Sequence, residues 1–191
     1  MQSKAMKIML SAPSGCGKSS IAKKLLETDA NLVLSISATT RQPRPGEVDG
    51  EHYFFKTKND FKKIHYLESA EIYGNFYGTP RDFIEKKLLE GRDVLFDIDF
   101  QGAYQIINST KSKVVSIFIL PPDMETLRKR MINRGQDEQN VIELRLEKAQ
   151  SEIEHAKNYD YIVINDSFDQ AIEEIRAIIL AERNKKTYDS K

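Results

Sequence analysis

What this 191-residue sequence lacks excludes several classes of protein. It has one cysteine, Cys16, so no disulfide can form within the chain and a reducing compartment is expected. Basic and acidic residues balance at 29 each, so no net charge draws the chain to nucleic acid or to an anionic membrane. No apolar run approaches the roughly 18 residues of a membrane span, and the one near the N-terminus is too short for a secretory signal. We therefore expect a cytoplasmic protein without membrane or nucleic-acid partners, in which any anion-binding site is local.

Apolar runs and helix-like segments alternate along a chain whose 40% apolar and 30% charged residues are typical of one globular core. Runs with the length of buried strands occur at 7–11, 32–36, 93–99, 114–120 and 159–165. Segments with helical spacing follow at 17–27, 100–107, 124–132 and 168–183. This alternation predicts an α/β fold, with a parallel sheet flanked by helices on both faces.

Two stretches interrupt the alternation. Residues 37–92 combine proline and glycine turns with short half-buried strands, and they close with a helix-like segment. Residues 126–147 are predicted to form a helix pair, dense in arginine, on either side of Gly135. We therefore divide the chain into an insertion (37–92), a second segment (126–147) and a core. The composition of the second segment suits a mobile cover better than a core element. The core comprises 1–36, 93–125 and 148–191.

The strongest chemical signal lies between the first strand and the first helix. Residues 12–19 read Ala-Pro-Ser-Gly-Cys-Gly-Lys-Ser, which fits the phosphate-loop pattern G-x-x-x-x-G-K-[ST] except at its first position. Gly15 and Gly17 permit positive φ, so that successive N–H groups can approach phosphate oxygens. Lys18 supplies a cation for the β and γ phosphates, and the Ser19 hydroxyl can ligate Mg²⁺. We predict a triphosphate site here, the alternative being a chance glycine-rich turn.

Two residues of this loop need separate interpretation. Ala12 replaces the first glycine, which implies either that this position need not be left-handed or that it tolerates a methyl group. Cys16 precedes a helix N-terminus, where a thiol pKa can be lowered, but we favour a small filler whose backbone N–H is used over a redox role. The residues predicted to bind the triphosphate are Ala12, Pro13, Ser14, Gly15, Cys16, Gly17, Lys18, Ser19 and Ser20.

The insertion carries a second candidate anion site. Arg41 and Arg44 lie three residues apart among prolines that restrict the backbone. Two preorganised guanidinium groups can hold one phosphate dianion through paired hydrogen bonds, and Tyr53 and Tyr77 could add phenolic donors. Taken alone, the two arginines could equally be a solvated charged turn.

Four blocks of sequence in this region resemble the guanylate kinase family. They read SATTRQPRPGE (37–47), DGEHYFF (49–55), ESAEIYGNFYGT (68–79) and DIDFQG (97–102). With the phosphate loop and Asn165-Asp166, the resemblance covers nearly the whole chain. It implies a P-loop NTPase core with a parallel β-sheet flanked by helices, a small mixed α/β insertion that binds the nucleoside monophosphate, and a helical lid. It also implies Mg²⁺-dependent transfer of the γ-phosphoryl group of ATP to GMP, and to dGMP.

The resemblance assigns roles within the insertion and just after it. The residues implied to bind GMP are Ser37, Arg41, Arg44, Tyr53, Glu68, Tyr77, Thr79 and Asp99. Glu68 has an independent physical argument, because an ionised carboxylate accepts from both the N1–H and the N2 amino group of guanine, whereas adenine offers an acceptor at N1. The alternative for Glu68 is an ordinary strand-edge charge. Phe76 and Pro80 depart from the family pattern, but Tyr77 is intact.

The arginines of the second interruption resemble the family's lid. Arg130 and Arg134 share one helix face and can converge on one anion, whereas Arg128 is interpreted as a solvated charge. By resemblance, Arg145 joins them at the ATP phosphates and Asn165 contacts adenine. The predicted catalytic residues are Lys18, Arg41, Arg130, Arg134 and Arg145.

Phosphoryl transfer needs two anions held in line and their charge neutralised, and an ionised phosphate acceptor needs no general base. Asp97 lies at the carboxyl end of a strand, where it can orient hydrated Mg²⁺. His52, His65 and His155 have no metal-ligand spacing, and we expect surface positions for them.

Two rival functions fit part of the sequence. One is a kinase of the same architecture that acts on another nucleotide or a phosphorylated sugar, and the Glu68 and Thr79 pair argues against it. The other is a guanylate-kinase-like module that binds phosphopeptides, and the presence of Lys18, Ser19 and the lid arginines argues against that. The expected partners are therefore small-molecule substrates, ATP and GMP, for a monomer or a homodimer.

Overall fold

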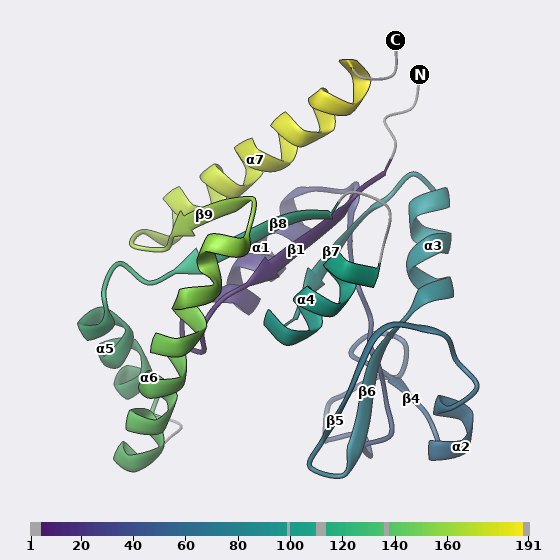
Figure 1. The fold of residues 1–191 in the computed structure, drawn as a ribbon, viewed down its shortest axis with the longest axis horizontal. Coiled ribbons are helices and arrows are strands. Elements are labelled where there is room, and N and C mark those ends of the chain that lie inside the picture. The colour runs from purple at the N-terminus through teal and green to yellow at the C-terminus, as the bar shows by residue number, and fades with distance from the viewer. Residues whose placement is uncertain (1–4, 99, 110–113, 136–137, 189–191) are drawn as a thin grey trace.

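The computed structural model describes residues 5–98, 100–109, 114–135 and 138–188, and its central element is a five-stranded sheet (Figure 1). Every paired neighbour in the sheet is parallel, so the carboxyl ends of the strands meet at one edge. The strands, in sheet order, are β2 (Leu32–Leu34), β7 (Asp93–Asp97), β1 (Lys7–Ser11), β8 (Val114–Leu120) and β9 (Tyr161–Ile164). This arrangement confirms the predicted α/β fold.

Helices cover both faces of the sheet and create two hydrophobic cores. The helices on the larger core are α1 (Lys18–Thr28), α5 (Met124–Arg134), α6 (Gln139–Ile153) and α7 (Phe168–Tyr188). The helices on the smaller core are α3 (Arg81–Leu89) and α4 (Phe100–Ser109). Alternation along β1 explains this division, because Ile8 and Leu10 pack into the first core and Met9 into the second. In the described part of the chain, no helix combines the length and apolarity needed to cross a bilayer.

The insertion forms its own mixed sheet, which lies at the lower right of Figure 1. Its elements are β3 (Ala38–Thr39), β4 (Phe54–Phe55), α2 (Lys58–Phe61), β5 (Tyr66–Ile72) and β6 (Asn75–Pro80), in the sheet order β4-β3-β6-β5. The β3–β4 pair is parallel, whereas β6 is antiparallel to both β3 and β5. Leu67 of β5 and Ile84 of α3 join the smaller core, and so the insertion is packed against the main sheet.

The boundaries of several elements differ from the sequence prediction. The strands expected at 32–36 and 93–99 end at Leu34 and Asp97. The expected helix pair at 126–147 lies within α5 and α6, which begin earlier and end later, with Gly135 as the left-handed cap of α5. The inner faces of these two helices contribute Leu127, Met131, Ile142, Leu146 and Ala149 to the larger core. We expected residues 126–147 to form a mobile cover and not part of the core. The inner faces of α5 and α6 instead belong to the larger core.

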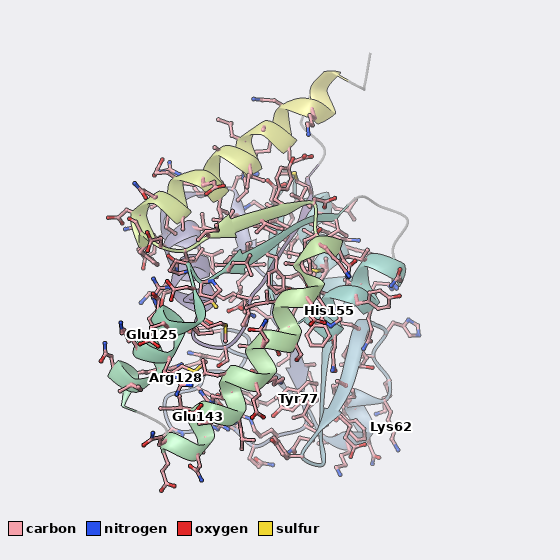
Figure 2. All side chains as sticks on the ribbon, turned by 60° about the vertical axis from the view of Figure 1, so that its left-hand side comes forward. Lys62, Tyr77, Glu125, Arg128, Glu143 and His155 are labelled. Carbon is pink, nitrogen blue, oxygen red and sulfur yellow. The ribbon has the colours of Figure 1, made fainter. Side chains whose placement is uncertain are left out.

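A short 3₁₀ helix, η1 (Glu154–Asn158), connects α6 to β9. His155 of η1 is half-buried, because its ring stacks on that of Phe100 with a centroid separation of 4.5 Å. Figure 2 shows His155 at the upper end of α6, next to α4. His155 thus lies at the surface with its ring partly covered, and the stack joins the end of α6 to the start of α4.

Candidate active site

The phosphate loop follows β1 at the carboxyl edge of the sheet and leads directly into α1. Gly15 and Gly17 have φ values of 88° and 85°, as the sequence predicted, whereas Ala12 is outside the left-handed region. A cavity of about 470 Å³ opens over this loop. It is lined by all the loop residues predicted to bind the triphosphate, together with Arg130, Met131, Arg134 and Arg145, whereas Asn165, the predicted adenine contact, is not among the lining residues. The structure therefore brings the loop and the three matched arginines together.

Close packing also explains the two glycines. A β-carbon at Gly15 would lie 3.1 Å from Leu127 Cδ1, and one at Gly17 would lie 2.8 Å from Asn165 Nδ2. The loop is thus packed against α5 on one side and against the end of β9 on the other. Positive φ is one reason for glycine at these positions, and lack of space is a second.

Lys18 extends from the start of α1 toward the end of β7. Its Nζ lies 2.6 Å from Asp97 Oδ1 and donates a hydrogen bond of 2.9 Å to the Ile98 carbonyl. Both charged side chains are about one-fifth exposed, at 19% and 24%. The loop lysine and the predicted magnesium-orienting aspartate are therefore direct neighbours at the carboxyl edge of the sheet.

Cys16 is buried beneath the loop, with 1% of its surface exposed. Burial raises the pKa of its thiol to about 12, although the positive charge of Arg130 acts in the opposite direction. Removal from water outweighs the nearby N–H groups of the helix, so the thiol stays protonated at neutral pH. This supports the interpretation of Cys16 as a filler.

The arginines of α5 and α6 differ in their surroundings. Arg130 donates from Nη2 to the Asp166 carbonyl at 3.2 Å, and its buried Nη1 has no hydrogen-bond partner in the described part of the chain. Arg128 is in contact with solvent as expected, with 38% of its side chain accessible, and it also forms two hydrogen bonds to Glu143 of α6. Figure 2 shows Arg128 and Glu143 close together between the two helices. The ion pair links α5 to α6, while Arg130 is left with a donor for a ligand.

Asn165 directly follows β9 and is buried, with 5% exposure. Its Nδ2 donates to the Cys16 carbonyl at 2.9 Å, and its Oδ1 has no hydrogen-bond partner among the described residues. The side chain therefore touches the phosphate loop and still offers one buried acceptor.

The second candidate anion site lies in the insertion and centres on Arg41. Arg41 donates from Nη2 to Glu47 Oε1 at 2.8 Å, and its guanidinium carbon lies 5.4 Å from the centre of the Tyr53 ring. The Tyr53 and Tyr77 rings meet edge to face at 6.1 Å. The hydrogen bond to Glu47, aided by one to Tyr77, raises the pKa of Arg41, and burial raises that of Tyr53. The structure thus gathers three of the four predicted phosphate-binding side chains.

Glu47 is the residue whose role in this cluster the sequence did not reveal. Its second carboxylate oxygen accepts from the Arg44 backbone N–H at 2.7 Å, so one side chain braces both arginine positions. The hydrogen bond from Arg41 lowers the pKa of Glu47 to about 2, with a further contribution from Arg44. The sequence does contain one signal for this contact, because Glu47 follows Arg41 by six positions across a proline-rich turn.

Glu68 and Thr79 are adjacent on the paired strands β5 and β6. The Thr79 hydroxyl donates to Glu68 Oε1 at 2.7 Å, and Thr79 itself is fully buried. Glycine at position 78 lets β5 and β6 pack closely, because a β-carbon there would lie 2.7 Å from Tyr66 Cδ1 and 3.0 Å from the Glu68 backbone oxygen. Ser37 lies just before β3 and accepts a hydrogen bond from Phe54 N–H through its backbone carbonyl. Asp99 lies outside the described residues.

The chain is similar in sequence and in fold to proteins of one family. The family model for guanylate kinase matches residues 4–182. A guanylate kinase of Rickettsia felis is 52% identical over 189 residues, covering 97% of this chain and 98% of its own. One of Rhizobium meliloti is 50% identical over 187 residues, with coverages of 96% and 85%. The crystal structure of the guanylate kinase from Anaplasma phagocytophilum, at 37% identity, superposes with a TM-score of 0.73 and covers 96% of this chain and 88% of its own. The chain belongs to the guanylate kinase family.

Proposed function

We propose that this enzyme transfers the γ-phosphoryl group of ATP to GMP and dGMP, and so produces ADP with GDP or dGDP. The observation that carries the proposal is the pairing of two anion-binding clusters. One is the phosphate loop with Arg130, Arg134 and Arg145 around a single cavity, and the other is the Arg41 cluster in the insertion.

The donor side has the groups that a triphosphate requires. The N–H groups of the glycine turns and the start of α1 supply partial positive charge, and Lys18 supplies a full one. Arg130 has an unpartnered buried Nη1 within the described residues, which suits it to a phosphate oxygen. The buried Oδ1 of Asn165 can accept from the amino group of adenine, whereas guanine presents a carbonyl oxygen at that position.

The acceptor side recognises a phosphate and a purine edge separately. Arg41, Arg44, Tyr53 and Tyr77 offer the donors for the monophosphate. The Thr79 hydroxyl, by donating to Glu68 Oε1, orients a carboxylate that can accept from guanine N1–H and N2. Because these contacts reach the base and the phosphate rather than the ribose 2′-hydroxyl, we include dGMP as a substrate.

The chemistry follows from this placement. An oxygen of the GMP phosphate attacks the γ-phosphorus as the bond to the ADP oxygen breaks, and the negative charge on the three equatorial oxygens is shared with Lys18 and the lid arginines. The attacking oxygen is already ionised, so no side chain has to remove a proton. Closure of the lid and the insertion over both nucleotides excludes water, which would otherwise hydrolyse ATP.

The donor set also fits a magnesium ion carried by the nucleotide. Ser19 lines the cavity at the start of α1 and offers a hydroxyl ligand, and the Asp97 carboxylate lies at the same edge of the sheet. When bound, the ion would neutralise charge on the β and γ phosphates. Ser19 would hold it directly and Asp97 through water, and Lys18 would then exchange part of its contact with Asp97 for phosphate.

A coupled assay with ATP and Mg²⁺ tests the proposal, with GMP, dGMP, AMP, UMP and TMP offered separately. We expect GMP and dGMP to be phosphorylated and the others to be used at least about 10⁴-fold less efficiently. The other bases would leave buried polar groups of the site without hydrogen-bond partners. Equal use of AMP, or the absence of phosphorylation with every acceptor, would refute it.

A further inference from the structure

We propose that Asn165 is a positioning residue that holds the phosphate loop in its binding conformation, in addition to any contact it makes with adenine. The proposal relies on the proposed function only for the identity of the donor nucleotide. Its evidence is the contact between the end of β9 and the loop, two segments far apart in the sequence.

The carbonyl groups of the phosphate loop need hydrogen-bond donors. When the N–H groups of a phosphate loop turn toward the ligand, its carbonyl groups point into the protein, where each needs a donor. The Cys16 carbonyl receives that donor from Asn165 Nδ2, at 2.9 Å in a buried contact between residues 149 positions apart. Since a carbonyl oxygen only accepts, the orientation of the amide is determined by this bond.

Asn165 is also packed closely against the phosphate loop. Asn165 Nδ2 lies where a β-carbon of Gly17 would come within 2.8 Å, so the amide is packed against the N-cap residue of α1. Asn165 is itself tied to the sheet, because its backbone N–H donates to the Leu120 carbonyl at 2.8 Å. The loop is therefore fixed to the edge of the main sheet through one buried side chain.

The turn that follows β9 also contacts an arginine of α5. The carbonyl of the next residue, Asp166, accepts from Arg130 Nη2 at 3.2 Å. One turn after β9 thus contacts both the floor of the cavity and an arginine in its wall. The amide nitrogen of Asn165 is engaged with the loop, while its unpartnered Oδ1 faces no acceptor or donor in the described chain. Asn165 can therefore hold the phosphate loop through Nδ2 and contact adenine through Oδ1.

A ligand that lacks a nucleobase, tripolyphosphate, distinguishes support of the phosphate loop from contact with adenine. We would measure the binding of Mg²⁺ tripolyphosphate and of ATP by calorimetry, with no GMP present, to the wild type, Asn165→Ala and Asn165→Leu. The binding of GMP alone would be measured separately for the same three proteins. The leucine variant keeps the shape of the side chain in case the smaller one disturbs folding. Loss of one buried hydrogen bond should weaken tripolyphosphate binding by about fivefold in both variants, with GMP binding unchanged. ATP binding should fall at least as much.

Asn108→Ala provides a matched control, because Asn108 Nδ2 donates to the Tyr104 carbonyl at 2.9 Å in an exposed position on α4. It should bind both probes as the wild type does. Unchanged tripolyphosphate binding with weakened ATP binding would make Asn165 a base contact alone and overturn the proposal. An equal loss of GMP and tripolyphosphate binding would indicate a general loss of structure and overturn it as well. Because the readout needs no phosphoryl transfer, failure of the proposed function would not affect it.

Discussion

The ammonium group of Lys18 and the carboxylate of Asp97 lie 2.6 Å apart at the carboxyl edge of the sheet. The same ammonium group also donates to the Ile98 carbonyl. Under the proposed function, a triphosphate in the cavity would compete with the end of β7 for this cation. Lys18 would then turn from one anionic partner to another, so that its charge would stay compensated.

Lys18→Ala should lower kcat by about 10³-fold or more, because it removes a positive charge that stabilises the transferring phosphoryl group. Steady-state kinetics with saturating ATP and GMP would measure the loss. Lys24→Ala is the control, since Lys24 lies on the same helix with its side chain 48% exposed. Turnover near that of the wild type in Lys18→Ala would remove the phosphate loop from the mechanism.

Glu68→Gln should reduce kcat/KM for GMP by about 10²-fold, while AMP use stays the same or rises. The amide replaces one acceptor oxygen with a donor that faces the donor edge of guanine, and leaves one hydrogen bond unmade in a partly buried site. The ratio of kcat/KM values for GMP and AMP is the measurement. Glu71→Gln, on the exposed part of the same strand, should leave that ratio unchanged. If Glu68→Gln kept both its GMP efficiency and its preference, the guanine assignment would be wrong.

Much of this arrangement was predictable from sequence because its signals are local. The phosphate loop needs two glycines, a lysine and a hydroxyl at fixed spacing between a strand and a helix, and the structure has them there. The core strands were found from apolar runs of the right length, since a parallel sheet buries both faces of each strand. Their ends were less well predicted, because β2 stops at Leu34 where pairing with β7 ends.

Contacts between distant segments were not predictable in the same way. Spacing alone placed Arg128 on a solvated face, but its partner Glu143 is on the following helix, and no periodicity specifies that pairing. Asn165 was assigned only by resemblance, and its bond to the Cys16 carbonyl depends on how β9 meets the loop. Glu47 was part of a recognised block, yet its brace on Arg41 follows from the conformation of the turn.

Glu47→Ala should raise KM for GMP several-fold and leave KM for ATP unchanged. The substitution frees Arg41 Nη2 and the Arg44 backbone N–H, so both arginines lose the support that directs them to the monophosphate. Glu47→Gln keeps an acceptor oxygen and should recover part of the affinity. Because the pKa of Glu47 is lowered to about 2, its carboxylate is ionised throughout the neutral range and adds no pH dependence of its own there.

Glu51→Ala, in the same exposed turn region, serves as the control for Glu47→Ala. Equal increases in KM for GMP and ATP would argue against a positioning role for Glu47. A lower KM for GMP in Glu47→Ala would show that repulsion between the carboxylate and the substrate phosphate outweighs the support it gives Arg41.

The Cys16 thiol should react with alkylating reagents very slowly at neutral pH and quickly once the chain is unfolded in urea. Burial both blocks access and raises its pKa from 9.0 to about 12, which leaves almost no thiolate. Since the folded pKa lies above the unfolded one, the stability gained by keeping the thiol neutral is complete below pH 9.0 and is lost as the pH rises toward about 12. Cys16→Ala should therefore show a smaller decline of unfolding free energy over that interval than the wild type. Rapid labelling of the folded protein at neutral pH would contradict the assignment of Cys16 as a buried filler, and would point instead to a thiol activated by the helix N-terminus and Arg130.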